Sequence, residues 1–121
     1  MPDLSVSLAV GPDAPRTARA AVRDVDCPTE ELRDDVILLT SELVARALRQ
    51  RPTLPQAAVK LRVWMPEHVV RVEVSGPPDV LPPFGSDEGP EYEVALLETL
   101  TDRWSLTVSD LRTRAWFEID R

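Results

Sequence analysis

The chain has 121 residues, 43% of them hydrophobic, which is enough for one domain with a buried core that needs no disulfide or metal. Its formal net charge of -7 opposes binding to nucleic acid and to anionic lipid surfaces. The apolar stretches are too short to span a bilayer, and residues 1–4 lack the pattern of a secretory signal, so we expect a cytoplasmic protein without membrane contact.

The N-terminal segment predicts a strand followed by a helix. Hydrophobic and small residues alternate over positions 5–10, a period that is typical of a β-strand. A helix is predicted next, because Asp13 suits the N-cap, Pro15 suits the first turn, and the alanine-rich run to Arg23 favours helical backbone.

A second, longer helix is predicted from Thr29, which suits the N-cap, to the residues before Pro52. Acidic side chains near its start and arginines near its end complement the helix dipole. One side of this helix carries a hydrophobic stripe that we expect to face the core: Val36, Ile37, Leu39, Leu43, Val44, Ala47 and Leu48.

The middle of the chain predicts a β-hairpin and then a long loop. Segments 59–65 and 70–75 both alternate in hydrophobicity, which indicates two strands with one buried face. The tract 76–90 contains three of the four glycines and five of the twelve prolines, so we interpret it as a lid-like surface loop.

The C-terminal part predicts a third helix from about Pro90 to Asp102, followed by strands over 104–108 and 115–119. No internal repeat is present, so residues 1–121 are interpreted as a single domain. The predicted fold class is α/β (α+β), a two-layer sandwich in which helices cover one face of a mixed, mainly antiparallel sheet.

The opposite face of this sheet is expected to expose two tryptophans among charged residues. Aromatic and arginine side chains dominate protein interfaces, so this face is a candidate partner-binding surface. The alternative is that the same side chains pack across strands and only stabilise the sheet. The residues of this face are Arg62, Trp64, Arg71, Glu73, Arg114, Trp116 and Glu118.

Four segments resemble, in order and spacing, the ATP-binding domain of the bacterial anti-sigma-factor serine kinases, which have the histidine-kinase-like ATPase (Bergerat) fold. Segment 39–44, LTSELV, resembles the helix of the first nucleotide box, and segment 70–75, VRVEVS, resembles the strand that enters the second. Segment 96–104, LLETLTDRW, and strand 115–119, AWFEI, resemble the last helix, its turn and the closing strand. The resemblance covers roughly residues 5–120 and implies the same fold.

The first nucleotide box of this family uses a glutamate as general base and an asparagine, one helical turn later, as a magnesium ligand. Glu42 matches the glutamate, but Arg46 occupies the asparagine position. A guanidinium has no lone pair for a cation, so the implied magnesium site is altered. Arg46 either contacts phosphate directly or pairs with Glu42 across one turn and closes the pocket, and we favour the second interpretation.

The other two boxes are altered as well. Gly76 stands where the family has the aspartate that binds adenine, and Asp79 replaces that aspartate only if the intervening prolines fold back. The acidic side chains at the two glycine positions of the third box crowd and repel a triphosphate, or stabilise a helix N-terminus without any ligand. The positions of this box are Gly89, Glu91, Tyr92 and Glu93.

The resemblance therefore implies a regulatory protein-binding module, a pseudo-kinase with little or no ATP binding and no expected cofactor. Its implied partner is a sigma factor or an anti-anti-sigma-type protein, and a homodimer is also consistent with the resemblance. One alternative is an active ATP- and magnesium-dependent serine kinase in which Glu42 is catalytic. Another is an accessory domain that binds a different small ligand under the loop 76–90.

The lone cysteine and the lone histidine give no sign of a metal centre. Cys27 and His68 have no partner side chains at the spacings that metal sites require, so we expect no metal. A catalytic thiol at Cys27 is disfavoured because no base lies at a suggestive spacing.

Overall fold

The computed structural model describes most of the chain as a mixture of helices and strands. The described residues are 2–9, 12–24, 29–48, 58–66, 68–76, 91–108 and 112–121. In chain order, the elements formed by these residues are β1 (Leu4–Ala9), α1 (Ala14–Arg23), α2 (Glu30–Leu48), β2 (Ala58–Trp64), β3 (Val69–Gly76), α3 (Glu91–Leu100), β4 (Arg103–Val108) and β5 (Thr113–Asp120).

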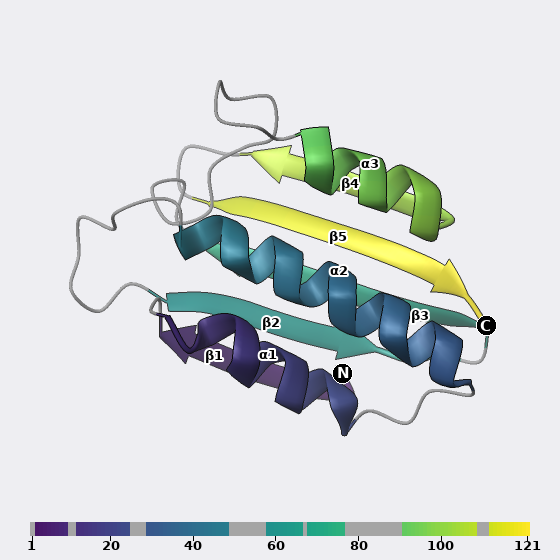
Figure 1. The fold of residues 1–121 in the computed structure, drawn as a ribbon, viewed down its shortest axis with the longest axis horizontal. Helices are drawn as coiled ribbons and strands as arrows, with labels where there is room; N and C mark the ends of the chain where they lie inside the picture. Colours follow the sequence, from purple (N-terminus) through teal and green to yellow (C-terminus); the bar gives the residue numbers. More distant parts are fainter. Residues whose placement is uncertain are drawn as a thin grey trace.

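The elements form two layers. One layer is a five-stranded sheet with the order β1-β2-β3-β5-β4, and the three helices lie on one face of it (Figure 1). This confirms the predicted two-layer α+β arrangement. All four pairings between the described strands are antiparallel, so the expected mixture of strand directions does not occur among these residues.

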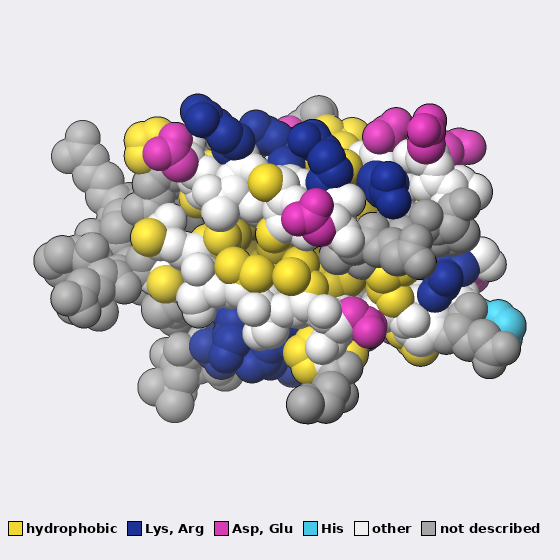
Figure 2. Space-filling view, turned by 90° about the horizontal axis from the view of Figure 1, so that it is seen from below, with side chains coloured by type: hydrophobic (Ala, Val, Ile, Leu, Met, Phe, Trp, Pro, Cys, Tyr) yellow, Lys and Arg dark blue, Asp and Glu magenta, His cyan; other side chains and the backbone are white. Residues whose placement is uncertain are grey.

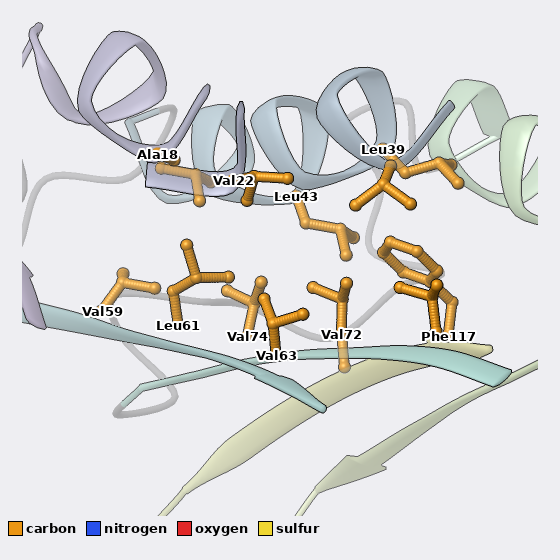
Figure 3. Packing of buried hydrophobic residues seen from close by; sticks show 14 of the residues in the cluster. Ala18, Val22, Leu39, Leu43, Val59, Leu61, Val63, Val72, Val74 and Phe117 are labelled. Carbon is orange, nitrogen blue, oxygen red and sulfur yellow. The ribbon is translucent and has the colours of Figure 1, made fainter. Parts of the chain in front are cut away.

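The core lies between the two layers and follows from the periodicity of each element. Leu39 and Leu43 of α2 point toward the sheet, where side chains of β3 and β5 meet them (Figure 3). Burying one such side chain contributes about 1.5–3 kcal/mol. The fully buried core residues of the strands include Val59, Leu61, Val63, Val70, Val72, Val74 and Phe117.

The two N-terminal helices begin in different ways. The Thr29 hydroxyl accepts a hydrogen bond from the backbone N–H of Leu32 at 3.1 Å, so the predicted N-cap of α2 is confirmed. Asp13 occupies the N-cap position of α1, but its side chain makes no capping hydrogen bond. Its carboxylate instead lies 3.6 Å from the guanidinium of Arg16, so the predicted N-cap position is confirmed but without a side-chain hydrogen bond.

The element boundaries shift only slightly from those predicted. The first strand begins at Leu4 rather than Ser5, and the third helix ends at Leu100. Apart from Gly76, the predicted lid-like loop lies outside the described residues. None of the helices that the structure describes has both the length and the apolar character that crossing a bilayer requires.

Candidate functional site

The predicted nucleotide-box residues lie on three elements. Glu42 is on α2, Gly76 is the last residue of β3, and Glu91 is the first residue of α3. The predicted Glu42–Arg46 pair stays a prediction, because one of its side chains is not described. Outside the description lie Asp79, Gly89 and the side chains of Arg46, Glu91, Tyr92 and Glu93.

Glu42 is half-buried in an open groove of about 620 Å³ that lies between α1 and α2. Arg19 and Arg23 of α1 line one wall, and Arg33 and Leu38 of α2 join Glu42 on the other. Gly76 is not among the lining residues. The structure therefore brings the candidate base together with the arginines of α1, which sequence reasoning did not identify as site residues.

The position predicted to correspond to the family's adenine-binding aspartate lies in the sheet. Gly76 is buried and pairs with Thr113 at the start of β5. The Thr113 hydroxyl is buried and has no hydrogen-bond partner among the described residues. An unpaired buried hydroxyl costs about 1–3 kcal/mol, so this oxygen is a candidate contact for a polar ligand group. Thr113 was missed because a core-facing threonine in a strand gives no distinct sequence signal.

The face of the sheet that none of the described helices covers, the helix-free face, carries a continuous series of ion pairs. Glu118 accepts hydrogen bonds from Arg71 Nη1 at 3.0 Å and from Arg103 Nε at 2.7 Å, and Arg103 also bonds Asp120. The hydrogen bond from Arg103 holds the pKa of the Glu118 carboxyl below its ordinary value; Arg71 adds to this effect, while burial opposes it. Hydrogen bonds to Asp120 and Glu118 raise the pKa of Arg103 in turn.

A second group of ion pairs surrounds Glu73. Only 5% of this glutamate is exposed, although it lies on the helix-free face. Its Oε1 atom is 3.8 Å from Arg62 Nη1 and 3.9 Å from Arg114 Nη1. The two guanidiniums come from the strands on either side of β3. Arg62 of β2 lies opposite Glu73, and Arg114 of β5 lies opposite Ser75, two residues further along β3. The buried carboxylate is therefore compensated by charge within the sheet.

The two tryptophans bracket a guanidinium on the same face. The Arg71 guanidinium lies 4.2 Å from the ring centre of Trp116 and 5.9 Å from that of Trp64, which is cation–π geometry. An adjoining hollow of about 480 Å³ is lined in part by Trp64, Arg71 and Met65. The backbone N–H of Met65 donates to Asp3 Oδ2 at 2.6 Å, which fixes one rim of the hollow.

No group of three or more histidine, cysteine, aspartate or glutamate side chains suited to a metal ion occurs within the described ranges. His68 is exposed, and Cys27 lies outside those ranges. A scan against protein-family models and a search of curated proteins found no match to this chain.

Proposed function

We propose that this chain is a cytoplasmic regulatory protein-binding module with the histidine-kinase-like ATPase fold, a pseudo-kinase that holds a partner and does not transfer phosphate. The partner by resemblance is a sigma factor or an anti-anti-sigma-type protein. The observation that carries the proposal is the cluster of Trp64, Arg71 and Trp116 on the sheet face that no described helix covers.

This cluster has the composition of an interface anchor. Tryptophan and arginine are the residue types most enriched among the side chains that carry binding energy. Arg71 is already held between two rings and bonded to Glu118, so little side-chain freedom remains to be lost when a partner binds. The hollow beside Trp64 and Met65 offers a place for an apolar side chain of that partner.

The altered nucleotide boxes also support a protein-binding function. Glu42 lies among arginines of the α1–α2 groove, and Gly76 offers no carboxylate to an adenine amino group. A general base without a metal ligand beside it cannot organise a triphosphate for in-line transfer. These features support a protein-binding role for the scaffold.

The proposal is tested by capturing partners from the source bacterium with the native protein as bait. We expect a sigma factor or an anti-anti-sigma-type protein to be enriched by the wild type and lost with Trp116→Ala. The matched control is Glu98→Gln, an exposed change on α3. Thermal unfolding checks that each variant is folded. Capture of neither class, or equal capture by Trp116→Ala, contradicts the proposal.

A second candidate function is residual binding of a nucleotide or another polar ligand beside Gly76. Two observations favour it: Glu42 matches the general base of the family, although it lines the α1–α2 groove without Gly76, and the Thr113 hydroxyl is buried without a partner in the described part of the chain. A fluorescent ATP analogue with magnesium tests this candidate. Saturable micromolar binding that is lost with both Glu42→Ala and Thr113→Val supports an active site and contradicts the pseudo-kinase proposal.

A further inference from the structure

The charged side chains that line the α1–α2 groove differ from those elsewhere on the described surface in whether they form ion pairs. Arg19, Arg23 and Arg33 line it together with Glu42, yet the described residues show no ion pair or hydrogen bond between these side chains. Elsewhere the described arginines are paired. Those bonded to or within ion-pair distance of a carboxylate or carbonyl oxygen include Arg16, Arg62, Arg71, Arg103, Arg114 and Arg121.

Arg33 has the least satisfied donor in the groove. Its Nε atom is buried and has no hydrogen-bond partner among the described residues. A buried guanidinium N–H without an acceptor is unfavourable, and native proteins rarely keep such a donor unless another molecule satisfies it. A carboxylate is the acceptor that matches the fork geometry of a guanidinium.

Two hydrophobic residues that are not fully buried, Ile37 and Leu38, lie beside these arginines. Leu38 is 37% exposed, the one large hydrophobic residue of the described chain that reaches this exposure, and Ile37 beside it is only partly buried. Ile37 was predicted to belong to the core stripe, but it lines the groove as well as packing against the core. An exposed leucine next to unpaired charges is the combination that a partner segment covers.

Basic and acidic side chains both line the groove around Ile37 and Leu38. Figure 2 shows basic side chains gathered on the helical layer, at the top of the view, and acidic side chains at its right-hand end, where α2 begins. Exposed Glu30 and Asp34 belong to that end and also line the groove. A small polyanion would meet three carboxylates as well as three arginines, so the lining does not suit phosphate or nucleic acid.

We infer that the α1–α2 groove is a docking site for an amphipathic segment of a partner protein. That segment places an apolar side chain on Ile37 and Leu38 and a carboxylate among Arg19, Arg23 and Arg33. A helix laid between two helices presents side chains at the required spacing of three or four residues. The inference rests on the proposed protein-binding function but assigns a second surface, on the opposite layer from Trp64 and Trp116.

A selection of displayed random peptides tests this assignment. Peptides of roughly 16 residues, long enough for about four helical turns, are selected on the wild-type protein. We expect enriched peptides to carry an aspartate or glutamate three or four residues from a leucine, isoleucine or phenylalanine. A failure to enrich any peptide, or enrichment without the acidic residue, overturns the inference.

The enriched peptide is then synthesised with a fluorescent label, and its Kd is measured by polarisation. We expect Leu38→Glu and Arg33→Met each to weaken binding at least about 10-fold, because the first places a charge against the apolar side chain and the second removes the donor. Arg16→Gln is the control, an exposed arginine of α1 that does not line the groove, and is expected to change Kd less than about 2-fold.

Two further readouts separate the possible failures. Arg33→Met is expected to raise the midpoint of thermal unfolding while it weakens peptide binding, which a purely structural arginine would not do. If tripolyphosphate displaces the labelled peptide, the groove is a site for small anions, and the inference is overturned. Binding that responds to Trp116→Ala but not to Leu38→Glu also overturns it, yet leaves the proposed protein-binding function standing.

Discussion

The helix-free face of the sheet and the α1–α2 groove contain the same residue types in opposite states. On the sheet face, Arg71 and Arg103 share Glu118, and Glu73 lies between two further arginines. In the groove, Arg19 and Arg23 of α1 face Arg33 and the carboxylates of α2, and the described residues show no bond between these side chains. Charges on adjacent strands are brought together by the ladder itself, whereas charges on two helices can remain available for a partner.

The largest expected effect on the free energy of unfolding concerns Glu73, on the sheet face. Glu73→Ala leaves two guanidiniums without their shared carboxylate and opens a space beneath them, so we expect the free energy of unfolding to fall by about 2 kcal/mol. Urea denaturation measures this change. The groove counterpart, Arg23→Gln, is expected to stay within about 0.5 kcal/mol. Equal effects of the two substitutions would remove the distinction between the surfaces.

A smaller gain is expected where a buried group lacks a partner. Thr113→Val replaces an unpaired hydroxyl by a methyl group of similar shape, so we expect the free energy of unfolding to rise by about 1 kcal/mol. Ala115 follows on the same inner face, and Ala115→Ser, which adds a buried hydroxyl, provides the reverse control. A loss of stability in Thr113→Val would mean that the hydroxyl has a bonding partner.

The pH dependence of stability tests whether the ion pairs of Glu118 on the sheet face stabilise the fold. The pKa of Glu118 is lowered in the folded protein, so its contribution is complete above the ordinary value of 4.5 and is lost as the pH falls through the folded pKa. We expect the stability difference between the wild type and Glu118→Gln to shrink steadily below pH 4.5. A difference that is constant between neutral and acidic pH would contradict the ion-pair description.

The smallest expected effect concerns the acidic start of α2, beside the groove. Burial raises the pKa of Asp35 above its ordinary value of 3.8, and the charges of Glu31 and Asp34 raise it further. The charged form is therefore disfavoured by folding, and the cost appears as the pH rises through this raised pKa. Asp35→Asn is expected to add roughly 0.2–0.5 kcal/mol at neutral pH and nothing below pH 3.8. Parallel urea titrations at the two pH values measure both quantities.

Features encoded by neighbouring residues were predictable from the sequence. The Thr29 cap of α2 and the alternation along β2 depend on local spacing, and both agree with the structure. In β3 the alternation in burial ends at Val72, because Glu73 and Ser75 are buried as well. Asp13 also occupies the N-cap position of α1 that the sequence predicts, although its side chain makes no capping hydrogen bond. Local pattern therefore carries most of the fold.

Features of the candidate sites depend on contacts between distant residues. The composition of the sheet face was predicted, but Arg103 and Asp120 were not included, because Arg103 of β4 bonds Glu118 and Asp120 of β5 and only the register places these strands side by side. The burial of Glu73 on an outward face likewise requires the flanking strands. The α1–α2 groove depends on how two helices pack, and no local spacing in either helix indicates it.

The most direct test of the contrast between the two surfaces is hydrogen exchange of arginine Nε–H groups, observed by NMR in the free protein. Arg103 Nε donates to Glu118 Oε1, so its proton is expected to exchange slowly. Arg19 and Arg23 have no bonded acceptor among the described residues, so their Nε protons are expected to exchange rapidly and to become protected when the groove peptide binds. Slow exchange at Arg19 and Arg23 without any ligand would contradict the account.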